Sequence, residues 1–243
     1  MWGVIVNRFK QGYRTLSYPK GKISLPKRFR GRPIVSGAAV DMGKLLFNKD
    51  AQAGSPEGSL VYSRDHRMAV SKKQDLVVHA DEIKLASALN DKMKKIFGRS
   101  LKLREVNAGS CGGCDAEIQV LGIVVFDLSR FGIQFVASPR HADGLIITGP
   151  VTKNMEAVLK KTYEATPYPK IVIAVGACAI SGGPFTDSPE VKNGADKVVP
   201  VDLYIPGCPP HPLTILDGLL RMLGKIEEKE PWKLRSAAVK DGE

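Results

Sequence analysis

Short apolar runs alternate with amphipathic stretches along the second half of the chain. The apolar runs that predict strands lie at residues 101–106, 134–137, 144–148, 170–175 and 202–205. Stretches with a helical spacing of apolar residues lie at 115–126, 153–164 and 213–223. This alternation is typical of a parallel sheet with helices on both faces. We therefore predict an α/β domain over residues 101–225.

The first 35 residues combine an apolar stripe with basic residues and prolines. The residues near helical spacing are Trp2, Val4, Ile5, Phe9, Tyr13 and Leu16. They predict a short amphipathic helix that lies on a partner or at the level of lipid headgroups, or else packs on the chain's own body. The prolines and the basic run at 27–33 then predict an extended basic arm.

A second helix is predicted at residues 81–98, with Asp81 as its cap and Gly98 as its end. Its apolar stripe consists of Ile83, Leu85, Leu89, Met93 and Ile96. We interpret it as a linker that closes a basic N-terminal extension, residues 1–100. Residues 226–243 are polar and charged and predict a tail.

Composition excludes some classes of protein. The hydrophobic content of 43% and the charged content of 25% are those of a soluble globular chain. No segment approaches the roughly 18 apolar residues of a membrane-spanning helix, and no secretory signal is visible at the N-terminus. We therefore expect the protein to stay in the reducing cytoplasm.

The net charge of +11 is concentrated in the first half of the chain. Residues 1–104 hold 22 Lys and Arg against 8 Asp and Glu, whereas residues 105–243 hold 14 against 17. Such a basic half fits an anionic membrane surface with its associated subunits, or nucleic acid. We expect no nucleic acid, because no recognition motif accompanies the charge.

The chain contains only four cysteines: Cys111, Cys114, Cys178 and Cys208. Each lies in a glycine-rich turn, where close backbone approach to sulfur is possible because glycine lacks a Cβ. Three of the predicted strands lead into these turns, so they meet at the carboxyl edge of the sheet. The pattern therefore predicts an iron–sulfur cluster held by all four thiols.

Three other interpretations of the cysteines are open. The first is a structural zinc site, although zinc ligands usually come as two close pairs. Disulfides are disfavoured without a secretory signal. A redox pair of Cys111 and Cys114 would leave Cys178 and Cys208 unexplained.

Four motifs over roughly residues 103–225 resemble the small, cluster-bearing subunit shared by membrane-bound [NiFe] hydrogenases, formate hydrogenlyase and respiratory complex I. They are Cys111-Gly-Gly-Cys114-Asp-Ala-Glu117, Phe131-Gly-Ile-Gln-Phe-Val-Ala-Ser-Pro-Arg-His-Ala-Asp143, Gly176-Ala-Cys178-Ala-Ile-Ser-Gly-Gly183 and Val201-Asp-Leu-Tyr-Ile-Pro-Gly-Cys-Pro-Pro210. Complex I has adjacent first cysteines, whereas two glycines separate them here. This spacing resembles the energy-converting hydrogenases and related sulfur-reducing complexes.

The resemblance implies a flavodoxin-like sheet and one [4Fe–4S] cluster on the four cysteines. It implies an electron-transfer subunit of an oxidoreductase whose catalytic centre lies on a separate large subunit. A ferredoxin-like subunit with two clusters and integral membrane subunits are the other expected partners. The chain would then lie peripherally on the cytoplasmic side of the membrane, in a hydrogenase-type complex or in a sulfur- or quinone-reducing relative.

The resemblance also implies roles for two further residues. Glu117, in the first turn of a helix, is implied in proton transfer near the large subunit, although a structural acid at a helix start explains it too. Arg140 is implied at a cavity between the subunits, although a surface turn explains it equally well. His141 and Asp143 lie in the same turn.

The extension leaves two alternatives open. Its arm weakly resembles the start of the ferredoxin-like partner subunit, but residues 36–80 contain no cysteine. It is therefore either a ferredoxin-like remnant without clusters or an extension specific to this branch. A zinc-stabilised module whose basic arm binds nucleic acid is the alternative from a different class of protein.

Overall fold

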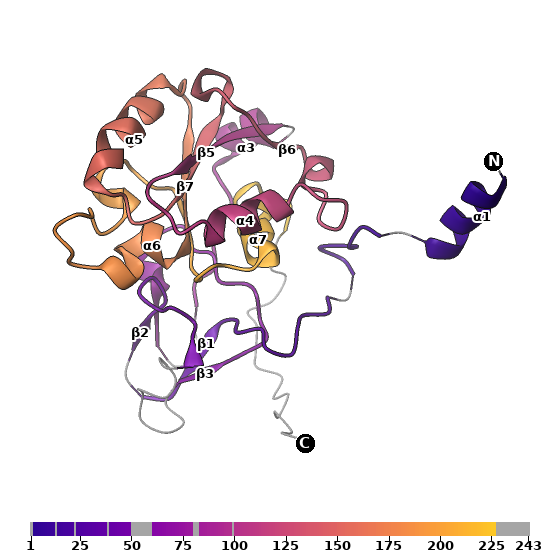
Figure 1. The fold of residues 1–243 in the computed structure, drawn as a ribbon, viewed down its shortest axis with the longest axis horizontal. Coiled ribbons are helices and arrows are strands. Elements are labelled where there is room, and N and C mark those ends of the chain that lie inside the picture. The colour runs from indigo at the N-terminus through magenta and orange to yellow at the C-terminus, as the bar shows by residue number, and fades with distance from the viewer. Residues whose placement is uncertain are drawn as a thin grey trace.

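The computed structural model describes residues 2–226 except 13, 22, 38, 50–59, 80–82 and 99 (Figure 1). At its centre is a parallel sheet with the order β6-β5-β7-β8-β9. The strands are β5 (Leu101–Asn107), β6 (Ile133–Phe135), β7 (Gly144–Thr148), β8 (Ile171–Val175) and β9 (Leu203–Ile205). Counted within the sheet, this is the order 2-1-3-4-5 of flavodoxin-like folds, so the predicted fold class is confirmed.

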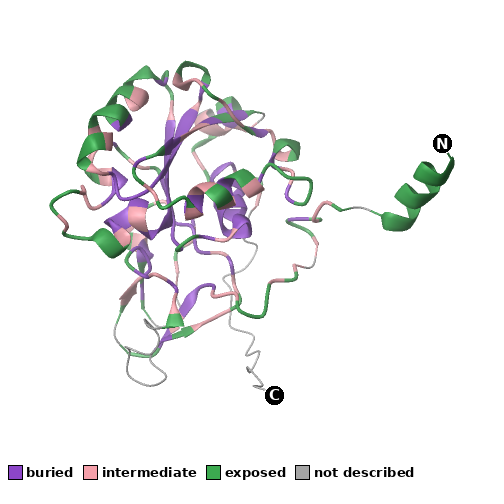
Figure 2. Cartoon of the chain, in the orientation of Figure 1, coloured by how far each residue is buried: buried purple, intermediate pink, exposed green. Residues whose placement is uncertain are grey.

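Helices cover both faces of this sheet because alternate strand residues point in opposite directions. Ile146 and Ile173 join the core on one face, with α4 (Gly113–Val120) and α7 (Pro212–Met222). Ile147 and Val172 join the core on the other, with α5 (Lys153–Ala165) and α6 (Gly176–Ser181). The strands β7 and β8 are buried along their full length, as Figure 2 shows.

The N-terminal extension packs on the sheet domain and adds short strands of its own. β1 (Pro33–Val35) pairs with β3 (Leu60–Tyr62), and β2 (Val40–Asp41) pairs with β4 (Val77–Val78), both antiparallel. Val70 forms an antiparallel bridge with Tyr204 of β9, through N–H···O distances of 3.0 and 2.9 Å. Residues on both sides of position 100 therefore share the same two cores, while the division into domains at that position stays a prediction.

Short 3-10 helices fill several connections. They are η1 (Lys73–Leu76), η2 (Leu128–Phe131), η3 (Pro139–His141), η4 (Gly183–Phe185) and η5 (Ala195–Lys197).

The predicted helix at 81–98 is wrong in its first half. The helix, α3 (Asp91–Phe97), begins after Asn90, whose side chain accepts a hydrogen bond from the Met93 N–H at 3.0 Å. Residues 83–90 are not helical, because the N–H groups of Ala86 and Leu89 donate to carbonyls elsewhere in the fold. Asp81 lies outside the described residues, and Gly98 is the C-cap as predicted.

The first predicted helix is present as α1 (Trp2–Gln11). None of its residues is buried, and Figure 1 shows it standing clear of the rest of the chain. Packing on the chain's own body is therefore not what the structure shows. Of the described helices, none is long and apolar enough to cross a lipid bilayer. The predicted polar tail falls on residues outside the described ranges, apart from Ile226.

A buried polar network fastens the extension to α7. The Tyr18 hydroxyl donates to Asp217 Oδ1 at 2.6 Å, and Arg221 Nε donates to Asp217 Oδ2 at 2.7 Å. His66 Nε2 lies 3.4 Å from the same hydroxyl. Asp217 is only 1% exposed and Arg221 5%, so their ion pair is shielded from water.

We expect Asp217→Ala to lower the free energy of unfolding by about 3–5 kcal/mol, because the substitution breaks a buried ion pair with Arg221 and removes the acceptor of the Tyr18 hydroxyl. Urea denaturation of the full chain measures this change. Lys160→Ala is the matched control, since it breaks an i,i+4 pair with Glu156 in which Lys160 is 51% exposed. Equal losses in the two variants would contradict the assignment.

Candidate metal centre

The four cysteines come from three turns that follow strands of the sheet. Cys111 precedes α4 and Cys114 lies in its first turn, after β5. Cys178 lies in α6, directly after β8, and Cys208 follows β9. All these strands are parallel, so their carboxyl ends bring the cysteines to one edge. The structure therefore gathers all four predicted ligands in one place.

The thiols are close enough to affect one another's ionisation. Burial raises the pKa of Cys114 to about 12, and negative charge on Cys178, Cys208 and Cys111 adds to the rise. Burial raises the pKa of Cys178 to about 11, with Cys208 and Cys111 contributing. These thiols are protonated at neutral pH unless a cation compensates their charge, as a bound metal does.

Glycines leave space beside the sulfur atoms. A Cβ at Gly176 would lie 2.5 Å from Cys114 Sγ, and a Cβ at Gly183 would lie 2.8 Å from Cys178 Sγ. Both glycines also have positive φ, +89° and +56°. Four thiol donors with this open space fit an iron–sulfur cluster, whose inorganic sulfides need room next to the ligands. Among the described residues, no three His, Cys, Asp or Glu side chains form a site for a single metal ion.

Asp115 fixes the turn that carries Cys111 and Cys114. Its carboxylate accepts hydrogen bonds from the hydroxyls of Ser110 and, at 2.8 Å, Thr148. Burial opposes ionisation, yet these hydrogen bonds keep the pKa of Asp115 below its usual value. The side chain of Asn107 accepts from the N–H groups of Gly109 and Ser110 at 3.0 and 2.8 Å. These hydrogen bonds were not predicted, because the only signal for them in the sequence is the presence of polar residues around the cysteines.

Glu105 on β5 is the neighbour of Asp115. Burial raises the pKa of Glu105 to about 7, and the hydrogen bond to Asp115 and the charge of Asp115 add to the rise. Glu105 therefore holds a proton in weakly acidic solution and loses it near neutrality. No sequence pattern marked this carboxyl pair.

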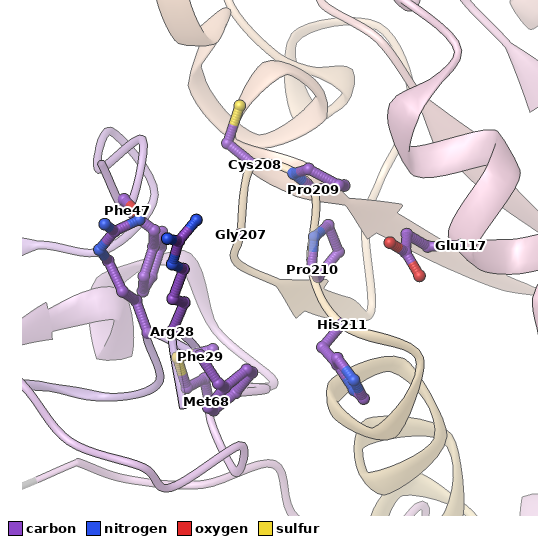
Figure 3. A pocket seen from close by; sticks show the side chains of 11 residues that line it. Arg28, Phe29, Phe47, Met68, Glu117, Gly207, Cys208, Pro209, Pro210 and His211 are labelled. Atoms are coloured by element: carbon purple, nitrogen blue, oxygen red, sulfur yellow. Dashed lines mark hydrogen bonds between the residues drawn. The ribbon is translucent and has the colours of Figure 1, made fainter. Parts of the chain in front are cut away.

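A pocket of about 240 Å³ opens beside Cys208, between the ligand turn and the basic arm (Figure 3). One side is formed by Arg28, Phe29 and Arg30 of the basic arm together with Phe47 and Met68, and the other side by Glu117 and residues 207–211. Burial raises the pKa of Glu117. The position of the arm beside Cys208 was not predicted, because a local sequence pattern carries no information on a contact between residues so far apart in the chain.

His211 lines the same pocket but serves the backbone. Its Nδ1 accepts a hydrogen bond from the Leu213 N–H at 3.1 Å and caps α7. Burial lowers the pKa of His211, and the charge of His66 lowers it further. His211 is therefore neutral at physiological pH, which leaves Glu117 as the acid of this pocket.

Arg140 lies away from the thiols. It belongs to η3, just before Asp143, whose backbone and side chain bond to Lys102 at the start of β5. The cysteine turn begins beyond Asn107, at the other end of that strand, roughly 16 Å away. Arg140 is exposed, as is His141. The structure thus brings Glu117 to the cysteines and leaves Arg140 at the opposite edge of the sheet.

Comparison with known proteins gives the family. The family model described as NADH ubiquinone oxidoreductase, 20 Kd subunit, matches residues 111–222. A probable membrane-bound hydrogenase subunit from Pyrococcus furiosus is 48% identical over 132 residues, 54% of this chain and 79% of that protein. The chain belongs to the 20 Kd subunit family. The resemblance predicted from the four motifs is therefore confirmed.

Two further proteins are similar to this member of the 20 Kd subunit family. Formate hydrogenlyase subunit 7 of Escherichia coli is 47% identical over 145 residues, 60% of this chain and 56% of its own length. A solved chain of a membrane-bound sulfane sulfur reductase, an archaeal respiratory membrane complex, is 36% identical and superposes with a TM-score of 0.49 over 56% of this chain and 75% of its own. The sequence relatives are subunits of oxidoreductases, so the prediction of an oxidoreductase subunit is confirmed, and the family supports an electron-transfer role.

We expect Glu105→Gln to remove a pH dependence of stability. Because the folded pKa of Glu105 is raised to about 7, the folded chain binds the extra proton between about pH 4.5 and 7, and stability falls as pH rises through that window. The advantage of the variant over the parent should therefore grow from pH 5 to pH 8 in urea unfolding of the metal-free chain. Glu164→Gln, at an exposed carboxylate of α5, should follow the parent at both values.

We expect Gly176→Ala to reduce metal loading severely, because its Cβ would push against Cys114 Sγ. Gly112→Ala is the matched control: its φ of +87° is almost the same, but its Cβ would meet nothing within 4 Å. Iron and acid-labile sulfide per chain, measured after anaerobic purification, separate the two. Equal loss in both variants would show that backbone strain, rather than contact with sulfur, decides loading.

Proposed function

We propose that this chain is the electron-transfer subunit of a membrane-bound hydrogenase-type complex and holds one [4Fe–4S] cluster on Cys111, Cys114, Cys178 and Cys208. The observation that carries the proposal is the meeting of four thiols from three separate turns at one edge of the sheet. In this role the chain passes electrons between a ferredoxin-like subunit and a catalytic large subunit. Integral membrane subunits complete the complex, at the cytoplasmic side of the membrane.

The cluster, when bound, supplies one-electron transfer at a potential tuned by its surroundings. The chain's own residues hold and shield it. Glycines keep side chains away from the sulfur atoms, and Asp115 fixes the first turn through Ser110 and Thr148. Cys114 is buried, whereas Cys111 and Cys208 are exposed. The exposed side is where we place the contact with the large subunit, since electron transfer requires close approach there.

Glu117 is proposed to hold and pass a proton beside this contact. It is half-buried, burial raises its pKa, and it shares the pocket with Cys208. Arg140 is proposed at a second contact between subunits. It is exposed and, in the described part of the chain, has neither a hydrogen bond nor an ion pair. The contact proposed at Cys208 and the contact proposed at Arg140 therefore lie at opposite ends of the strands.

Two alternatives remain in view of the relatives and the composition. The same electron-transfer role in a sulfur- or quinone-reducing complex uses the same four thiols and differs in the large subunit. A zinc-stabilised module that binds nucleic acid would use the thiols for structure alone.

The deciding experiment is metal analysis and EPR of the complex purified anaerobically through a tag on this chain. We expect iron at about four atoms per chain and a reduced [4Fe–4S] signal that Cys208→Ser abolishes or shifts. Lys161→Ala, on the exposed side of α5, should change neither iron nor signal.

Each other outcome selects an alternative. Nickel in a copurified large subunit supports the hydrogenase form, and iron without nickel moves the complex to the sulfur- or quinone-reducing branch. One zinc per chain without iron would overturn the electron-transfer role.

A further inference from the structure

α1 carries an apolar face that nothing in the described chain covers. With 100° between successive residues, Trp2, Ile5, Val6 and Phe9 fall within an arc of about 100°. Trp2 is 80% and Phe9 83% exposed. An exposed aromatic face of this kind on an isolated helix calls for an apolar environment that the described residues do not supply.

Apart from Gly3 and Val4, the rest of the helix surface is polar and basic. Lys10 and Arg8 flank the apolar arc on its two sides, while Asn7 and Gln11 lie opposite. The helix contains no acidic residue, and none occurs in the first 40 residues of the chain. Long basic side chains beside an apolar face place their charges at a headgroup while their methylene stems stay in the apolar layer.

The attachment of α1 directs it away from the sheet domain. Gly12, with a φ of +63°, ends the helix. Four residues later, the backbone of Leu16 is hydrogen-bonded to the sheet domain. The Leu16 N–H donates to the Val125 carbonyl at 2.9 Å, and Arg130 Nη2 donates to the Leu16 carbonyl at 2.6 Å. Next to Leu16, the loop after α4 exposes three more apolar side chains, Ile123 at 49%, Val124 at 65% and Val125 at 36%. The helix and the loop therefore offer apolar surface at the same side of the molecule.

We propose that α1 lies in the headgroup layer of an anionic lipid bilayer, with Trp2, Ile5, Val6 and Phe9 inserted and Arg8 and Lys10 at the lipid phosphates. The charge decides for lipid over a protein groove, because a basic surface without a single acid complements a uniformly anionic layer. Tryptophan also favours this interface, where its ring is apolar and its N–H stays hydrated. At about 15 Å the helix is too short to cross the roughly 30 Å core, so it lies in the plane of the membrane.

The test uses the full chain carrying Trp232→Phe, so that Trp2 is the only tryptophan. Vesicles of phosphatidylcholine are compared with vesicles in which roughly one quarter is phosphatidylglycerol. We expect at least about tenfold tighter binding to the anionic vesicles, a blue shift of Trp2 emission, and several-fold weaker binding in high salt.

Two serine substitutions distinguish insertion of the apolar face from nonspecific adsorption to the vesicles. Phe9→Ser should weaken binding roughly tenfold, because the removed ring is the largest apolar group of the face besides Trp2. Val4→Ser is the matched control, since Val4 is 75% exposed on the opposite side, and it should change binding less than about twofold. Neither residue is buried, so circular dichroism should show both variants unfolding at the temperature of the parent.

Three results would overturn the proposal. They are equal binding to both kinds of vesicle, an equal loss with Val4→Ser and Phe9→Ser, and a Trp2 blue shift that appears only in the detergent-purified complex, which would assign α1 to a protein groove. Vesicle binding requires neither cluster nor partner, so its failure leaves the electron-transfer proposal intact.

Discussion

Four sulfur atoms that would repel one another as thiolates are held together at one edge of this sheet, and much of the structure follows from that constraint. Burial alone raises the pKa of Cys114 and Cys178, and each neighbouring thiolate raises it further. The assembled site therefore favours a cation at its centre. The parallel strands bring the four cysteines together, because turns from distant parts of the chain converge at one edge without long loops. Gly176 and Gly183 leave the space beside the sulfur atoms that a Cβ would fill.

The extension is integrated with this sheet rather than appended to it. Val70 continues the hydrogen bonding of the sheet beyond β9, and Tyr18 reaches the buried Asp217 of α7. These contacts fix the path of the basic arm, which then forms one side of the pocket at Cys208. The charges around Cys208 thus come both from the basic extension and from the second half of the chain, which has more acidic than basic residues.

Regular elements were predictable from the sequence wherever a local pattern decided them. β7 occupies the predicted residues, and the other strands of the sheet differ by one or two. α6 was not predicted, because five of its six residues are buried and a helix buried all round shows no polar face. The start of α3 was missed because Ala86 and Leu89 form backbone hydrogen bonds to distant residues. Contacts between residues so far apart in the chain do not change the spacing of apolar residues from which a helix is predicted.

The candidate site divides in the same way. The cysteines are rare and lie in distinctive turns, so composition and motif were enough to select them. The position of Arg140 depends on the register between β5 and β7, which pairs Leu103 with Gly144 and places η3 at the amino ends of the strands. The supporting carboxyls, Glu105 and Asp115, meet across a strand and a helix. Neither fact is encoded in neighbouring residues.

One consequence concerns the stoichiometry of the pocket beside Cys208. Both of its sides come from a single polypeptide, so the arm reaches the ligand turn at a local concentration fixed by the fold and independent of the abundance of any other subunit. Every copy of the chain carries its own guanidinium groups to this position from the moment it folds. Arg28 and Arg30 therefore lie beside Cys208 whether or not another protein is bound to the chain.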